Sequence, residues 1–204
     1  MPSHRAYLSL FFGMFAFLTG CATIVPQSET PTTASWETRE SALNKINQWQ
    51  INGKIAVQTA NDSGSATINW TQNQQQYAIS LTGPLGAGGM QLAGAPGHVT
   101  LTNAKGAQFT AATPEQLLAK QWGYDLPVSN LRYWVRGLPV PGMASSKQFD
   151  NFHRLATLTQ QGWQIQFLGY TNKNGIELPR RISVSSSALK AKMVIYDWNI
   201  NHSR

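Results

Sequence analysis

Residues 65–82 read SATINWTQNQQQYAISLT, and this stretch decides the fold class. Apolar residues occupy every second position from Ala66 to Trp70 and again from Tyr77 to Leu81. A period of two is typical of a β-strand with one buried and one exposed face, because successive side chains point to opposite sides. The run between the two segments is polar, as in a tight turn. The stretch therefore predicts two antiparallel strands joined by a short connection.

The same alternation continues on both sides of this strand pair. It occurs before it at Ile51–Val57 and after it at Met90–Leu92 and Val99–Leu101. Short turns rich in Gly, Asn, Asp and Pro separate these runs, which favours antiparallel pairing in chain order. Further strands are predicted near the C-terminus at Phe152–Thr159, Trp163–Gly169, Arg181–Ser185 and Leu189–Trp198.

Three segments have the features of helices. Trp36–Trp49 carries large apolar residues on one face and follows Ser35, a plausible N-cap. Thr113–Trp122 begins with a cap residue and a proline and is followed by glycine. A third, short helix is expected to be capped by Ser129, and residues 140–150 are expected to form a loop.

These elements predict a mainly β (α+β) domain built on one antiparallel sheet. The sheet should hold about ten to eleven strands, and a twisted sheet of that size curls. Curled on itself, it gives an unclosed β-barrel with an apolar inner face. We expect the three helices to cover its opening.

The composition excludes several classes of protein. Only 12% of the 204 residues are charged, and the formal net charge is +7. The single cysteine rules out an internal disulfide and cysteine-clustered zinc or iron–sulfur sites. Neither paired acidic residues nor a nucleophile elbow, a zinc-protease motif or a phosphate-binding loop is present in the sequence. We therefore expect no enzyme, no cofactor and no metal.

The basic charge, taken alone, is compatible with three kinds of partner: nucleic acid, an anionic membrane surface or an acidic protein.

The first segment indicates export. Residues 1–20 carry a basic start and then an apolar run too short to span a membrane, as in a signal peptide. The segment leads into LTGC at residues 18–21, which resembles a bacterial lipobox, so Cys21 is the predicted lipid anchor. Residues 21–35 are then a lipidated N-terminus and flexible tether, and residues 36–204 a single domain. The alternative is an ordinary signal peptide cleaved nearby, which leaves a free thiol.

The residue after the cysteine is alanine rather than aspartate, which points to the outer membrane. Export also excludes nucleic acid as a partner.

Two features allow both a structural and a functional interpretation. Gly83–Gly89 contains four glycines and one large apolar residue, Leu85, with no bulky neighbour to shield it. Leu85 either folds back into the core or forms an exposed apolar tip that meets lipid. The seven tryptophans likewise either pack in the core or line a cavity for an apolar ligand.

The motifs, taken in order and spacing, resemble the LolB family. They are the lipobox, WQINGKIAV at 49–57, SATINW at 65–70, GPLG at 83–86, MQL at 90–92, WVRGLP at 134–139 and RRI at 180–182. The resemblance spans about residues 21–198. It departs in the extra glycines after Leu85 and in a polar tail at 199–204.

The resemblance implies an outer-membrane lipoprotein receptor, anchored at the periplasmic face through Cys21. Such proteins accept acylated lipoproteins from the periplasmic carrier LolA and insert them into outer-membrane lipid without nucleotide. The implied fold is an unclosed β-barrel with helices over an apolar acyl cavity, acting as a monomer. Membrane insertion is assigned to Leu85, flanked by Pro84 and Gly86. With the strand pattern, the expected cavity lining is Ile68, Trp70, Tyr77, Ile79, Trp134, Trp163 and Ile165.

Two other functions stay open. A lipid-anchored scaffold in outer-membrane assembly would have a filled core and no acyl ligand. A lipid hydrolase would need a nucleophile, and no candidate stands out. Seven basic residues also allow two interpretations. They form either a surface that steers an acidic carrier toward the protein or a solvated rim with no such role: Arg132, Arg136, Lys173, Arg180, Arg181, Lys190 and Lys192.

Overall fold

The computed structural model describes residues 33–86, 88–123 and 126–201. The predicted signal peptide, Cys21 and most of the tether lie outside the described residues, as does the end of the polar tail. Within the described ranges, no helix is long and apolar enough to cross a membrane.

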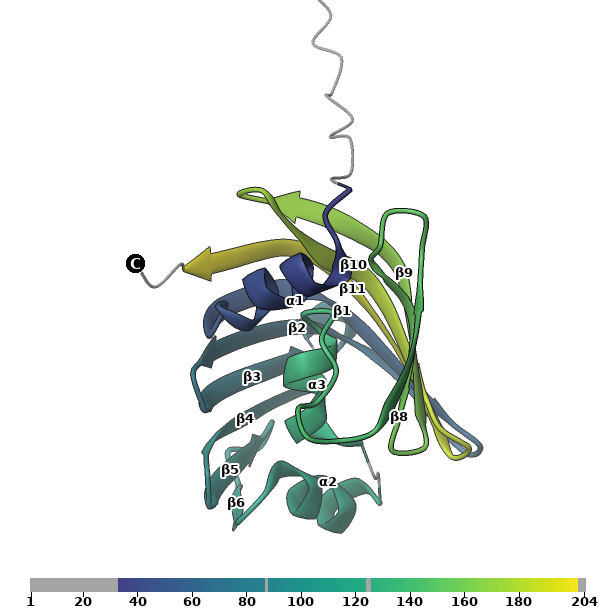
Figure 1. Cartoon of the computed structure of the whole chain (residues 1–204). Helices are drawn as coiled ribbons and strands as arrows, with labels where there is room; N and C mark the ends of the chain where they lie inside the picture. Colours follow the sequence, from purple (N-terminus) through teal and green to yellow (C-terminus); the bar gives the residue numbers. More distant parts are fainter. Residues whose placement is uncertain (1–32, 87, 124–125, 202–204) are drawn as a thin grey trace, which may run out of the picture. The chain divides into compact units, whose positions relative to one another are not determined.

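Eleven strands of the described chain form one antiparallel sheet. They are β1 (Gln48–Thr59), β2 (Ser63–Asn73), β3 (Gln76–Thr82), β4 (Gly89–Ala95), β5 (His98–Asn103), β6 (Gln108–Ala111), β7 (Ser145–Phe149), β8 (Leu155–Gln160), β9 (Trp163–Lys173), β10 (Ile176–Ser185) and β11 (Leu189–Asn201). Neighbouring strands follow chain order everywhere except in the middle, where β1 pairs with β11. The sheet thus consists of two meanders joined along β1 and β11 (Figure 1).

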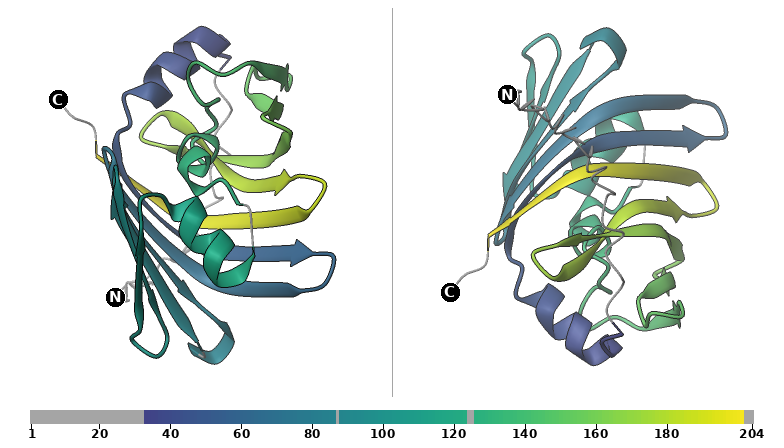
Figure 2. Two further views of the ribbon diagram at one scale, coloured as in Figure 1. Left: turned by 90° about the horizontal axis from the view of Figure 1, so that it is seen from below. Right: turned by 90° about the horizontal axis from the view of Figure 1, so that it is seen from above.

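The sheet is curled and unclosed, which confirms the predicted architecture. Its two edges are β6 and β7. The chain between these edges contains α2 (Pro114–Trp122) and α3 (Val128–Trp134), and both helices lie against the concave side (Figures 1 and 2). The third helix, α1 (Trp36–Asn44), precedes β1.

Tryptophans form the centre of the core. Trp49, Trp70 and Trp198 come from three adjacent strands, with ring centroids 5.0 and 5.5 Å apart. Each of these rings is buried. The indole N–H of Trp70 donates to Gln72 (3.0 Å), and that of Trp198 donates to the Pro179 carbonyl (2.9 Å). Burial of large aromatic surfaces of this kind is a major stabilising contribution.

A buried arginine ties α1 to the segment after α3. Arg136 donates hydrogen bonds to the carbonyls of Leu43 (3.3 Å) and Ile46 (2.6 Å), at the C-terminal end of α1. Carbonyls at a helix C-terminus lack partners within the helix, so a buried guanidinium is well suited to satisfy them. Burial lowers the pKa of Arg136 to about 10, which leaves it charged at neutral pH.

Three local predictions were wrong. The first helix ends at Asn44 rather than Trp49. Trp49 belongs to β1, where it is buried like Ile51 while Gln50 between them is exposed. Ser129 does not cap α3: Pro127 occupies the cap position, and the Ser129 N–H instead donates to Glu115 (2.7 Å). Residues 140–150 are not all loop, since β7 pairs with β8 there.

The second helix and the central strand carry features that the sequence does specify. Thr113 caps α2 by accepting from the Gln116 N–H (3.3 Å), and Gly123 ends it in the left-handed conformation. In β1, the register shifts at Gly53 opposite β11. A Cβ at Gly53 would collide with the Val194 carbonyl oxygen, so only glycine permits this close approach.

Candidate functional site

An apolar cavity of about 550 Å³ lies between the N-terminal half of the sheet and the two helices that span its opening. The sheet wall comes from β1–β4 and β11, and the opposite wall includes Leu118 of α2 and Leu131 of α3. Asp62 is the only ionisable side chain among the described lining residues. The volume falls within the ~300–1,000 Å³ typical of small-ligand sites.

Strand alternation explains why this wall is apolar. In β2, Ile68 and Trp70 are buried while their neighbours Thr67 and Asn69 are exposed. Ile68 pairs with Leu81 of β3, so inward positions of adjacent strands lie side by side. Small residues among them, such as Ala66 and Gly89, leave the space that larger side chains would fill.

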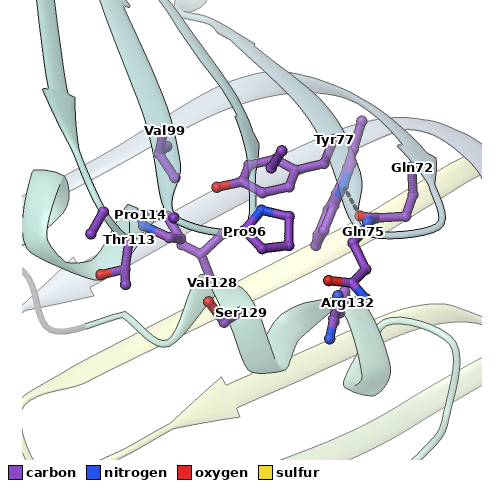
Figure 3. A pocket seen from close by; sticks show the side chains of 14 residues that line it. Gln72, Gln75, Tyr77, Pro96, Val99, Thr113, Pro114, Val128, Ser129 and Arg132 are labelled. Atoms are coloured by element: carbon purple, nitrogen blue, oxygen red, sulfur yellow. Dashed lines mark hydrogen bonds between the residues drawn. The ribbon is translucent and has the colours of Figure 1, made fainter.

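The structure brings together three of the predicted lining residues. Ile68, Trp70 and Ile79 all line the cavity. Tyr77 lines a smaller pocket of about 260 Å³, which shares Trp70 and Val128 with the cavity and therefore adjoins it (Figure 3). Burial, with a smaller contribution from Glu115, raises the pKa of Tyr77 to about 12.

The other three predicted residues lie elsewhere in the core. Trp134 and Ile165 have no exposed surface, and neither lines the cavity. Trp134 donates to Gln160 (3.1 Å) and packs 6.4 Å from the ring of Trp163. Gln160 also accepts from the Val140 N–H (2.9 Å), so this half of the barrel is filled by the chain that follows α3.

Sequence reasoning missed part of the lining. Met90, Met193 and Leu131 contribute to the cavity but were not proposed for it. Met90 and Met193 occupy inward positions of predicted strands, and Leu131 belonged to a predicted helix, so the pattern marked all three as apolar. What it could not show is which inward positions face an open space rather than another side chain.

The glycine-rich loop lies at the rim of this cavity. Pro84–Gly86 forms a one-turn 3-10 helix, closed by hydrogen bonds from Gly83 N to Gly88 O (3.1 Å) and from Gly86 N to Gly83 O (3.2 Å). Pro84 and Gly86 are exposed, while Gly83 and Gly88 line the cavity. The backbone of Leu85 thus occupies a tight turn beside the cavity entrance.

The basic residues do not form one surface. Arg136 is buried and holds α1, which removes it from any docking face. Lys173 pairs with Asp197 (3.1 Å). The remaining candidates on β10 and β11 are exposed: Arg180, Arg181, Lys190 and Lys192. Among the residues described, no group of three or more His, Cys, Asp or Glu side chains is placed to hold a metal ion.

Comparison with known proteins identifies the relatives of this chain. A family model described as "Outer membrane lipoprotein LolB" matches residues 47–198. The chain belongs to the LolB family. An outer-membrane lipoprotein LolB from Pseudomonas savastanoi pv. phaseolicola is 43% identical over 192 residues, covering 93% of this chain and 94% of the relative. Its counterpart in Pseudomonas syringae pv. syringae is 42% identical with the same coverage.

Membership of the LolB family gives this chain its location and general role. It is a lipid-anchored outer-membrane protein that belongs to a family of lipoprotein localisation. Solved structures show the same fold at negligible sequence identity. A DUF1329 family protein from Desulfovibrio piger covers 85% of this chain and 95% of its own, with a TM-score of 0.56 at 6% identity. A putative outer membrane lipoprotein-sorting protein domain from Vibrio parahaemolyticus covers 83% and 93%, with a TM-score of 0.52 at 5% identity.

Proposed function

We propose that this LolB-family protein accepts acylated lipoproteins from the periplasmic carrier LolA and inserts them into the outer membrane. The observation that carries the proposal is the apolar cavity between the sheet and α2–α3. Its walls offer aliphatic and aromatic surface and almost no charge, which suits hydrocarbon chains rather than a polar metabolite. We place Cys21 as the lipid anchor that holds the domain at the periplasmic face of the membrane, acting as a monomer.

Transfer through such a cavity needs no nucleotide. Each methylene group withdrawn from water contributes roughly 0.8 kcal/mol, so acyl chains move only between shielded sites. A tenfold advantage over the carrier requires about 1.4 kcal/mol. A slightly larger or more aromatic cavity than that of the carrier would provide that difference, and the bilayer is a still larger apolar solvent.

The loop at the cavity rim is the proposed point of membrane contact. Leu85 sits in a turn between exposed Pro84 and Gly86, next to cavity-lining glycines. A leucine that enters the bilayer at this position would place the cavity opening against lipid. Leu85→Glu should therefore still accept lipoprotein from LolA but release less of it into liposomes, while Leu85→Phe should keep release. Full insertion by Leu85→Glu would contradict this role.

A transfer assay tests the proposed function directly. The mature chain carrying Cys21→Ala is mixed with LolA loaded with a lipoprotein, and the cargo is followed by pull-down. Movement of cargo to this protein without nucleotide is the expected result. Retention of cargo on a LolA that is competent with another acceptor would exclude the receptor function and leave the lipid-anchored scaffold.

A further inference from the structure

The smaller pocket beside the acyl cavity differs from it in chemistry. Its walls come from β2 and β3, the turn between β4 and β5, the start of α2, and α3 (Figure 3). Polar residues in these walls are Gln72, Gln75, Tyr77, Thr113, Ser129 and Arg132. Because Trp70 and Val128 line both spaces, the polar pocket adjoins the apolar cavity.

Some of these polar groups are already engaged. Gln72 accepts from the Trp70 indole (3.0 Å) and donates to the Gln74 carbonyl (2.9 Å). Thr113 is occupied as the cap of α2. These side chains shape the pocket but have little capacity left for a ligand.

Two buried polar atoms in the pocket walls have no partner. Over the described parts of the chain, Tyr77 Oη and Arg132 Nε are the buried side-chain polar atoms that make no hydrogen bond. Both residues line this pocket, one from the sheet and the other from α3. Buried polar groups are normally satisfied, so two of them on residues that line one pocket point to a ligand that supplies the partners.

The surroundings hold both groups in position. A Cβ at Gly94 would collide with the Tyr77 ring and with Val99, so the phenol is packed closely against β4 and β5. The Arg132 guanidinium lies 4.8 Å from the Tyr133 ring and donates from Nη2 to the Tyr133 hydroxyl (2.9 Å). These contacts fix the guanidinium, while its Nε–H makes no hydrogen bond.

Both groups offer a hydrogen atom. Arginine has only donors, and a phenol with its pKa near 12 keeps its proton at neutral pH. An acceptor therefore satisfies both groups. Ester and amide carbonyls are acceptors that stand at the head of acyl chains, where chains in the cavity would meet the pocket.

We propose that this pocket binds the ester and amide carbonyls that join the acyl chains to the N-terminal cysteine of a lipoprotein, with Tyr77 and Arg132 as donors. The inference rests on the proposed function, in which the chains themselves occupy the cavity. It also orients the cargo, because the far ends of the chains then point away from the pocket, along the cavity toward the rim at Gly83–Gly89.

A pair of synthetic ligands tests the inference. The first is a cysteine peptide whose S-glyceryl group carries two palmitoyl esters, and the second has the same chains attached through ether links. Affinity of both is measured for the mature chain with Cys21→Ala, alone and combined with Tyr77→Phe. Tyr196→Phe, on an exposed ring of β11, is the matched control.

Tyr77→Phe should weaken binding of the ester ligand about three- to tenfold, as expected for one lost hydrogen bond. Binding of the ether ligand should change less than about twofold, and Tyr196→Phe should affect neither. Arg132→Met should likewise weaken the ester ligand more than the ether ligand. Because Tyr77→Phe removes an unpartnered hydroxyl and keeps the ring, its thermal unfolding midpoint should not fall.

Other outcomes overturn the inference. Equal losses for ester and ether ligands would mean that Tyr77 only shapes the cavity, and no loss for either would mean that the pocket binds no carbonyl. If Tyr77→Phe weakened binding of dioleoylphosphatidylglycerol but not of the ester ligand, the pocket would serve a phospholipid instead. Failure of the reference chain, which carries Cys21→Ala alone, to bind either lipopeptide would refute the proposed function itself, so the two failures can be distinguished.

Discussion

Replacing Ala66 by phenylalanine should fill part of the acyl cavity without disturbing the fold. Ala66 lies in β2 between the exposed Ser65 and Thr67, pairs with Ile55 of β1, and lines the cavity. A ring at this position enters a space of about 550 Å³ rather than a packed core, so the usual ~1–3 kcal/mol cost of overpacking should not appear.

The size of the effect follows from the lost volume. The added ring has six carbons and takes the room of roughly four methylene groups, which at ~0.8 kcal/mol each is about 3 kcal/mol. Acyl affinity should therefore fall on the order of 100-fold. Because transfer from LolA depends on a small affinity advantage, transfer should stop even though the protein remains folded.

The matched control uses the neighbouring position. Thr67 is exposed, pairs with Lys54 and does not line the apolar cavity, so Thr67→Phe adds the same ring outside that cavity. Both variants are compared by displacement of a fluorescent long-chain fatty acid and by urea unfolding. Unchanged affinity in folded Ala66→Phe, or equal losses in both variants, would refute the assignment of this cavity to acyl chains.

Three further predictions concern the fold and the carrier. Arg136→Ala should cost about 3 kcal/mol of unfolding free energy in urea, because it removes the buried charged donor from the carbonyls of Leu43 and Ile46; recovery by Arg136→Lys should be partial, and a loss below about 0.5 kcal/mol would contradict the role. Burial opposes ionisation of Asp150, but hydrogen bonds from the Arg154 and Phe152 N–H groups and from the Arg154 side chain lower its carboxyl pKa overall. Its stabilisation is thus present above the unfolded pKa near 4 and lost as pH falls through the folded value, so Asp150→Asn should flatten the decline of the unfolding midpoint below about pH 4. If the exposed basic residues of β10 and β11 steer an acidic carrier, the rate of transfer from LolA should fall severalfold as salt rises from 0.05 to about 0.5 M, and a rate independent of salt would favour a solvated rim.

The fold could be predicted because it depends on local patterns. Alternation at residues 65–82 predicted the two paired strands β2 and β3, and Thr113 and Gly123 predicted both ends of α2. The errors occurred where tertiary pairing outweighs local preference. Trp49 continues a helical spacing in the sequence, yet it lies in β1, which pairs with β2 and β11. The polar segment β7 has no apolar alternation, and it is a strand through its pairing with β8.

The site could be predicted only in part, for a different reason. Inward positions such as Trp70 and Trp134 look alike in sequence, since both are large aromatic residues on apolar faces. One faces open space and the other is enclosed by Gln160 and the chain after α3, which is a property of packing between distant segments. Leu85 differs from these core positions, because the glycines around it predict a turn from local sequence alone.

The two ends of the cavity suggest an order of events during release. With carbonyls held at Tyr77 and Arg132, the chain ends lie toward the rim that carries Leu85. A bilayer that meets this rim receives the chain ends first, and each methylene then passes from the cavity into hydrocarbon without the ~0.8 kcal/mol cost of exposure to water. The carbonyls leave last, into the interfacial region where water replaces their donors. Variants at the two ends should therefore act in opposite directions on release into liposomes: Leu85→Glu slows it by preventing contact, and Tyr77→Phe speeds it by loosening the head of the cargo.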